Sequence, residues 1–139
     1  MIVAVDTGGT KTLVAIFSLS GELLKSEKFP TPRDFNEYVT ITTDAIKRLS
    51  DNNIIDAMAI AVPGDIRDGI AKICPNIGWQ NVNVHQAFAT NFPGIKIVTG
   101  NDAAIGAIGE SRAISPVPHL AIYVTISTGI GTGIVADGK

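Results

Sequence analysis

Two glycine-rich segments and one carboxylate carry the residue types in this chain that can do chemistry. The first segment is Asp6-Thr7-Gly8-Gly9-Thr10-Lys11, and the second is Ser127-Thr128-Gly129-Ile130-Gly131-Thr132-Gly133. Apolar, β-branched residues flank both, so each predicts a hairpin whose turn offers backbone amides and hydroxyls. Between them, Asn101-Asp102 stands where an expected strand gives way to an expected helix. Two turns that can hold a polyphosphate, together with a carboxylate, favour phosphoryl transfer.

The first turn has the composition of an anion site. Gly8 and Gly9 permit positive φ and a close approach of the backbone to a ligand, while Thr10 adds a hydroxyl and Lys11 a positive charge. Asp6 would hold Mg²⁺ through water, because this ion takes few carboxylates beside phosphate oxygens. The segment is not a Walker A loop, which needs four residues between its glycines and a helix after its lysine. An ordinary tight hairpin without a ligand is the alternative interpretation.

The second turn and Asp102 each allow two interpretations. Glycine at alternate positions weakens a strand that needs only to be stable, so the segment with Thr128, Gly129 and Gly131 favours a ligand over a plain hairpin. Asp102 is either a helix cap, which the local pattern favours, or a general base. In the second role it would take a proton from a sugar hydroxyl that attacks the γ-phosphate. Asn101 beside it can hydrogen-bond a neighbouring hydroxyl.

Composition bounds the possible partners. The net charge is −2 and the 11 Lys and Arg residues are scattered, which predicts no nucleic-acid partner. Cys74 is the single cysteine, and His85 and His119 are far apart in the sequence, so we expect neither a disulfide nor a zinc site. The sequence opens with no secretory signal and has no apolar run of membrane-spanning length, which predicts no membrane partner and a cytoplasmic location.

Hydrophobic periodicity predicts an α/β fold that begins with three antiparallel strands. An Asp34–Glu37 capping box opens the first helix, and an Asn83–Gln86 pair opens the second. Ser115-Pro116-Val117-Pro118 is the expected connector, because two prolines favour an extended chain. The expected strands cover 2–5, 12–17, 23–28, 57–62, 69–74, 96–99, 120–126 and 130–135, and the expected helices 34–50, 83–92 and 102–114.

Five motifs, in this order, resemble those of the ROK family of sugar kinases. They are Asp6-Thr-Gly-Gly-Thr-Lys11, Val62-Pro63-Gly64-Asp65, Asn76-x-x-Trp79, Gly100-Asn101-Asp102-Ala103-Ala104 with Gly109-Glu110, and Ser127-Thr-Gly-Ile-Gly-Thr-Gly133. The resemblance runs from Ile2 to Lys139. It implies an actin-like ATPase (ribonuclease H-like) lobe with a mixed sheet and flanking helices. Residues 1–115 would form this lobe, and residues 116–139 a connector and the phosphate-binding hairpin that begins a second lobe.

The resemblance also implies an activity and a set of roles. The family transfers the γ-phosphate of ATP, with Mg²⁺, to a hexose hydroxyl. Asp102 matches the catalytic base. The positions that match the hexose site are Gly64, Asn76, Asn101 and Asp102; those that match the phosphate segments are Asp6, Gly8, Gly9, Thr10 and Lys11 in the first, and Thr128, Gly129 and Gly131 in the second. Trp79 and Glu110 match more loosely, and we expect packing roles for both.

Members of the family are longer, with two lobes that close around the substrate. Their Glu-x-Gly-His and cysteine-rich zinc segments have no counterpart in this sequence. We therefore expect a truncated chain that binds ligands weakly and catalyses little by itself, because catalysis needs positioning and closure. Its last hairpin would expose apolar edges, which favours a homo-oligomer or pairing with the absent C-terminal lobe.

Two other interpretations remain open. One is a non-catalytic sugar- or phosphate-binding module that a partner chain completes. The other is a phosphate-binding structural domain of the same fold that ignores hexoses. The resemblance leaves open which hexose is used, and whether ATP or inorganic polyphosphate is the donor.

Overall fold

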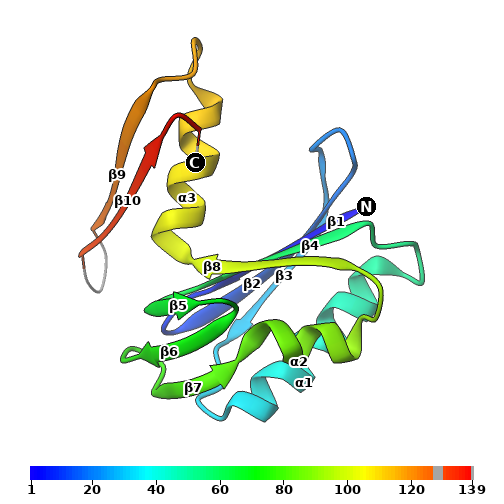
Figure 1. The fold of residues 1–139 in the computed structure, drawn as a ribbon. Coiled ribbons are helices and arrows are strands. Elements are labelled where there is room, and N and C mark those ends of the chain that lie inside the picture. The colour runs from blue at the N-terminus through cyan, green and yellow to red at the C-terminus, as the bar shows by residue number, and fades with distance from the viewer. Residues whose placement is uncertain (127–129, 139) are drawn as a thin grey trace. The chain divides into compact units, whose positions relative to one another are not determined.

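The computed structural model describes residues 1–126 and 130–138, and the chain divides into two compact units between Gly100 and Asn101 (Figure 1). The elements up to that boundary are β1 (Ile2–Thr7), β2 (Lys11–Phe17), β3 (Leu23–Pro30), α1 (Phe35–Ser50), β4 (Ala57–Val62), β5 (Asp65–Arg67), β6 (Ile70–Cys74), β7 (Trp79–Asn83), α2 (Val84–Asn91) and β8 (Lys96–Asn101). The second unit holds α3 (Asp102–Ala113), β9 (Leu120–Ile126) and β10 (Ile130–Ala136).

The first unit is built on a mixed five-stranded sheet with the order β3-β2-β1-β4-β8. The first three strands are antiparallel, with Asp6 opposite Leu13 and Thr12 opposite Phe29. β1 then pairs in parallel with β4, which requires a crossover connection, and α1 supplies it. The three antiparallel N-terminal strands and the mixed sheet that the sequence predicts are therefore confirmed.

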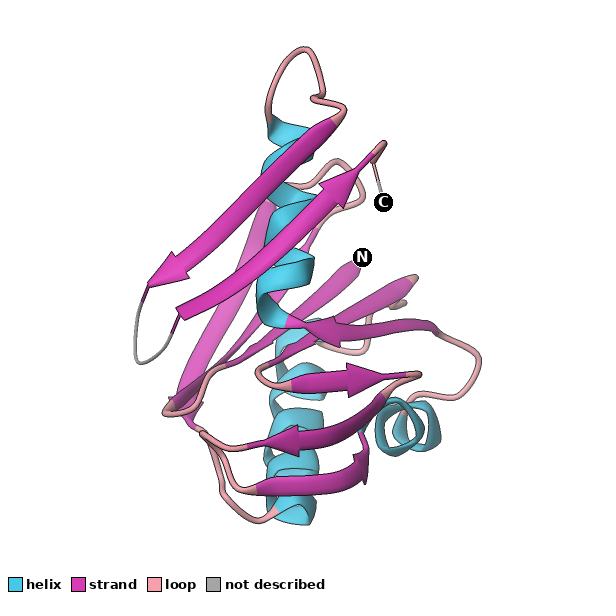
Figure 2. Ribbon diagram, turned by 60° about the vertical axis from the view of Figure 1, so that its left-hand side comes forward, coloured by secondary structure: helices cyan, strands magenta, loops and turns pink. Residues whose placement is uncertain are grey.

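One face of this sheet forms the core of the first unit. Side chains alternate along β1 and β4, so that Val3, Val5, Met58 and Ile60 are buried. α1 buries the stripe that contains Tyr38, Ala45 and Ile46, and its other side is solvated. Figures 1 and 2 show α1 and α2 on the same side of the sheet.

Both predicted helix starts of this unit are confirmed by their caps. Asp34 Oδ1 accepts a hydrogen bond from the Glu37 amide at 2.9 Å, and Asn83 Oδ1 accepts one from the Gln86 amide at 2.8 Å. The C-cap of α1 is Asp51, which has φ 50° and lies in the left-handed region. Aspartate and asparagine fit the N-cap because their side-chain oxygens accept hydrogen bonds from amides that have no partner within the helix. Aspartate fits the C-cap because a short polar side chain tolerates the left-handed region.

The sequence missed two short strands, β5 and β7, which form a three-stranded sheet with β6 in the order β5-β6-β7. Asp68 and Gly69, with φ 50° and 76°, make the tight turn between β5 and β6. β5 has only three residues, and β7 reads Trp-Gln-Asn-Val-Asn with few apolar side chains. These strands are formed by pairing with β6, so hydrophobic alternation alone does not indicate them.

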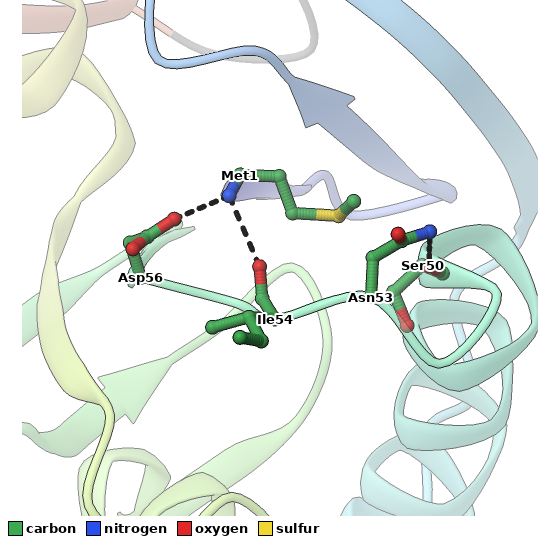
Figure 3. Close-up of polar contacts among 5 residues, drawn as sticks. All are labelled: Met1, Ser50, Asn53, Ile54 and Asp56. Atoms are coloured by element: carbon green, nitrogen blue, oxygen red, sulfur yellow. Dashed lines mark hydrogen bonds and ion pairs between the residues drawn. The ribbon is translucent and has the colours of Figure 1, made fainter.

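The start of the chain is held by the loop between α1 and β4 (Figure 3). The Met1 ammonium group donates to the Ile54 carbonyl oxygen at 3.0 Å and pairs with the Asp56 carboxylate. The Asp56 amide donates back to the Met1 carbonyl oxygen at 2.9 Å. In the same loop, Asn53 Nδ2 donates to the Ser50 carbonyl oxygen at 2.8 Å. These contacts hold the ends of β1 and β4 in the register that places Ile2 opposite Ala57.

An aromatic cluster joins the core to the first glycine turn. The ring of Tyr38 lies 4.6 Å from that of Trp79 and 6.0 Å from that of Phe88, measured between centroids. Its hydroxyl is 2.7 Å from Thr7 Oγ1, and both residues are fully buried. Because Thr7 is the last residue of β1, this hydrogen bond fixes the base of the turn to α1.

The buried hydroxyl of Tyr38 predicts a stability that falls at alkaline pH. Burial raises the pKa of Tyr38 above its ordinary value, and the nearby Asp6 carboxylate adds to the rise. Above about pH 10 the unfolded chain releases a phenolic proton that the folded chain keeps, so the free energy of unfolding decreases by up to about 1.4 kcal/mol per pH unit. Urea unfolding of the chain and of Tyr38→Phe at increasing pH measures this loss. Equal slopes for the two proteins would contradict it.

The second unit is one helix against one hairpin. β9 and β10 are antiparallel, with Ile130 opposite Ile126 and Gly133 opposite Tyr123. One face of the hairpin packs on α3, and its other face exposes large aliphatic side chains, between 51% and 81% accessible: Leu120, Ile122, Val124, Ile126, Ile130 and Ile134. The exposed apolar surface is thus a face of the hairpin. Within the described residues, no helix is both long enough and apolar enough to cross a bilayer.

Candidate functional site

The first glycine turn places its polar residues at the tip of the β1–β2 hairpin. The Gly8 amide donates to the Lys11 carbonyl oxygen at 2.9 Å, which closes the turn. Asp6, Thr10 and Lys11 are all exposed. A carboxylate, a hydroxyl and an ammonium group therefore meet solvent within one tight turn, which is a suitable arrangement for an anion and a hydrated cation.

Glycine is needed in this turn because neighbouring atoms crowd it, and the predicted close approach of the backbone to a ligand stays a prediction. The expectation that Gly8 and Gly9 use positive φ is wrong, since the positive-φ glycines lie elsewhere in the chain. Crowding is the cause instead. A Cβ atom on Gly8 would lie 2.9 Å from the Lys11 carbonyl oxygen, and one on Gly9 would lie 3.1 Å from Asn76 Cβ. Both distances are shorter than ordinary van der Waals contact, so a side chain at either position would force the turn to move.

Gly9 and Asn76 are therefore direct neighbours, and both belong to the first unit. Asn76 is exposed and lies in the turn that follows β6, where the Ile77 and Gly78 amides both donate to the Cys74 carbonyl oxygen. The structure thus brings one residue of the predicted hexose site against the predicted phosphate turn.

Gly64 reaches the same region through the end of β6. It has φ 107°, and a Cβ atom there would lie 2.3 Å from the Ile73 carbonyl oxygen and 3.0 Å from Cys74 Cα. The turn after β4 therefore packs directly on the backbone that leads into Asn76. This packing gives Gly64 a structural role whether or not it touches a ligand.

Trp79 packs as expected, and Glu110 does not. The Trp79 indole is buried in the aromatic cluster, and its Nε1 donates to the Arg33 carbonyl oxygen at 2.9 Å. Glu110 is exposed on α3. The prediction of a packing role is confirmed for Trp79 and wrong for Glu110.

Thr31 is a neighbour of the first turn that the sequence did not indicate. Its amide donates to the Thr10 carbonyl oxygen at 2.9 Å, and its Oγ1 donates to the Gly8 carbonyl oxygen at 2.8 Å. The same Oγ1 lies 2.9 Å from Thr12 Oγ1. A threonine between Pro30 and Pro32, just past an edge strand, is the only sequence signal for it.

Asn101 and Asp102 stand at the start of α3 in the second unit. Asn101 is the N-cap, because its Oδ1 accepts from the Ala104 amide at 3.1 Å. Asp102 is the first residue of the helix, and its Oδ1 accepts from the Ala103 amide at 2.8 Å. The capping that the local pattern assigned to Asp102 is therefore performed by Asn101. The positive end of the helix dipole favours the negative charge of a carboxylate at this place.

The alternating glycines of the last hairpin have a packing role. A Cβ atom on Gly133 would lie 2.4 Å from the Ala103 carbonyl oxygen and 2.6 Å from Ala107 Cβ, both in α3, whereas one on Gly131 would lie 2.8 Å from Thr125 Oγ1 on the facing strand β9. β10 therefore needs glycine at position 133 to approach α3 closely, and glycine at position 131 leaves room for the Thr125 side chain. Thr128 and Gly129, which were predicted with Gly131 to bind phosphate, lie outside the described residues, and the role of Gly131 stays a prediction.

The donors that the structure provides for a metal ion are few. Among residues 1–126 and 130–138, no three side chains of His, Cys, Asp or Glu gather closely enough to enclose one. Mg²⁺ differs from zinc in needing only one or two carboxylates, with water and phosphate oxygens as its other ligands. The exposed Asp6 carboxylate beside the turn fits Mg²⁺ in that arrangement.

Two curated relatives match almost the whole chain. The N-acetylmannosamine kinase of Shigella flexneri is 33% identical over 146 residues, which cover 99% of this chain and 48% of that protein. The glucokinase of Streptomyces coelicolor is 28% identical over 142 residues, which cover 100% of this chain and 44% of that protein. The chain therefore spans about half the length of the curated relatives it matches.

Solved structures show the same fold. A ROK family glucokinase from Streptomyces griseus, in complex with glucose and AMPPNP, matches with a TM-score of 0.88 at 28% identity. The match covers 99% of this chain and 45% of the glucokinase chain. The inorganic polyphosphate/ATP-glucomannokinase from Arthrobacter sp. strain KM matches with a TM-score of 0.84 at 25% identity. The match covers 99% of this chain and 59% of that chain. The predicted actin-like ATPase fold is thereby confirmed. The sequence profile of the ROK family matches residues 2–139, so the chain belongs to the ROK family.

Proposed function

We propose that this chain is the N-terminal part of a sugar kinase that transfers the γ-phosphate of ATP to a hexose hydroxyl. The contact between Gly9 and Asn76 is the observation that carries the proposal. It joins a turn with the chemistry of a phosphate site to a residue whose position matches the hexose site of the family. The relatives named as glucokinase and N-acetylmannosamine kinase support the same class of reaction.

In this reaction Asp102 is the general base. Its carboxylate takes the proton of the attacking sugar hydroxyl while the new bond from oxygen to the γ-phosphorus forms. The bond between that phosphorus and the bridging oxygen breaks, and ADP leaves. Asn101, Gly64 and Asn76 line the hexose, and the amides of the first turn hold the phosphates.

The other phosphate contacts come from Lys11 and Thr10 in the first turn, and from Thr128, Gly129 and Gly131 in the second. Mg²⁺, when bound, neutralises charge on the phosphate oxygens, and Asp6 would hold it through water. Residues 1–115 form the first lobe in this proposal, and residues 116–139 connect it to a second. Closure of two lobes excludes water, so we expect little activity from these residues alone.

A coupled phosphorylation assay on the full-length protein that carries this chain tests the proposal. The assay uses Mg-ATP with glucose, N-acetylmannosamine, mannose and fructose, and inorganic polyphosphate as a second donor. We expect sugar-dependent ADP release with at least one hexose. Binding of nucleotide by a folded protein that phosphorylates none of them would instead indicate a phosphate-binding module.

A further inference from the structure

We propose that Thr31 is a positioning residue that aims the amides of the first turn at the phosphate donor. The proposal rests on the phosphate role proposed above for that turn. It adds a residue outside the Asp6–Lys11 motif, contributed by the segment that follows β3.

Thr31 engages the turn at two separate peptide groups. Its Oγ1 donates to the Gly8 carbonyl oxygen at 2.8 Å, and its amide donates to the Thr10 carbonyl oxygen at 2.9 Å. Two hydrogen bonds from one residue fix both the position and the tilt of the turn between those carbonyls. Among the described residues, no other residue donates to both of these carbonyl groups.

Because of the geometry of the peptide bond, the hydrogen bond to the Gly8 carbonyl also sets the direction of the neighbouring amide. A trans peptide is planar, so its N–H points opposite to its C=O. Because the Gly8 carbonyl points toward Thr31, the Gly9 amide in the same peptide points away from it. Within the described part of the chain, the amides of Gly9 and Thr10 donate to no protein acceptor. Thr31 therefore turns away a carbonyl that would repel phosphate and leaves amides available for it.

Thr31 is itself held in place on two sides. A hydroxyl has one proton, and that of Thr31 goes to Gly8, so the 2.9 Å contact with Thr12 is a hydrogen bond donated by Thr12. Thr12 is fully buried in β2. Pro30 and Pro32 on either side restrict the backbone. A fixed donor holds a turn more precisely than a mobile surface side chain does.

Thr31→Val, made in the full-length protein, removes the hydroxyl and keeps the branched shape. We expect the KM for ATP to rise roughly tenfold, and the KM for the hexose to stay within about twofold, because only the phosphate contacts are misdirected. Thr31→Ser keeps the hydroxyl and should restore the KM for ATP. The matched control is Thr40→Val, which removes a threonine hydrogen bond of 2.9 Å to the Asn36 carbonyl oxygen on the exposed side of α1 and should leave both constants unchanged. Equal rises in both KM values, or no rise, would overturn the proposal.

A binding measurement separates this inference from the proposed activity. The full-length protein labelled with ¹⁵N-glycine is titrated with inorganic triphosphate, and the Gly9 amide resonance is followed. We expect the resonance to shift in the wild type and in Thr31→Ser, and to lose most of its shift in Thr31→Val. That pattern in a protein that phosphorylates no sugar would leave the role of Thr31 standing while the kinase proposal fails. The role of Thr31 would be overturned if the Gly9 resonance of the wild type did not shift with triphosphate, or if it shifted equally in all variants.

Discussion

Replacing Asp102 by asparagine is expected to lower the kcat for sugar phosphorylation by about 10²- to 10⁴-fold, the usual contribution of a general base. Asparagine keeps the Oδ1 atom that accepts from the Ala103 amide at 2.8 Å, and Asn101 still caps α3. The substitution therefore removes basicity and leaves the helix start intact. The measurement is steady-state phosphorylation with the hexose that the wild type prefers, together with sugar binding by calorimetry, which should change only a few-fold.

Asp34→Asn is the matched control for this substitution. Asp34 also stands at a helix start, where its Oδ1 accepts from the Glu37 amide at 2.9 Å. Asparagine caps helices about as well as aspartate, so we expect normal kcat and normal stability. If Asp102→Asn phosphorylates sugar as fast as Asp34→Asn does, Asp102 is not the base, and the chain is better described as a binding module.

Replacing Gly64 by alanine is expected to lower the free energy of unfolding by about 2–5 kcal/mol. Two penalties add at this position. The φ of 107° is unfavourable for a residue with a Cβ atom, and that atom would lie 2.3 Å from the Ile73 carbonyl oxygen. Left-handed backbone costs alanine about 1–2 kcal/mol, and overpacking against a backbone atom adds about 1–3 kcal/mol. Urea unfolding followed by far-UV circular dichroism measures the sum.

Gly78→Ala separates the two penalties. Gly78 has φ 91°, and a Cβ atom there would meet nothing within 4 Å. Its substitution should therefore show only the cost of the left-handed backbone, about 1–2 kcal/mol. Similar losses of unfolding free energy in the two variants would mean that the backbone of β6 moves at little cost and that crowding does not restrict Gly64. Because Gly64 packs on the backbone that leads to Asn76, we also expect Gly64→Ala to disturb the contact between Asn76 and Gly9.

The sequence predicted the parts of the fold that depend on local patterns. Short runs of apolar residues indicated β1 and β4, and the pairs Asp34–Glu37 and Asn83–Gln86 located two helix starts. In each case a few neighbouring residues contain the physical cause. The motif order also indicated the family correctly, because it combines several short signals along the whole chain.

The parts that failed depend on contacts between distant segments. β5 and β7 exist because β6 pairs with both, and nothing in their own sequences demands a strand. The need for glycine at position 9 comes from Asn76, and the need at position 133 comes from Ala103 and Ala107. Thr31 could not be recognised for the same reason, since its partners Gly8 and Thr10 are separated from it by β2 and β3.

The aromatic cluster has a practical consequence, because Trp79 is the single tryptophan of the chain. Its ring packs in the first unit, and the second unit contributes no tryptophan emission. Intrinsic fluorescence excited at the indole band therefore follows the first unit alone. The Trp79 ring packs against Tyr38, whose hydroxyl bonds to Thr7 at the base of the glycine turn. In the sequence, Trp79 follows Asn76 by three residues. The chain thus contains its own spectroscopic label beside the region where the phosphate turn meets Asn76.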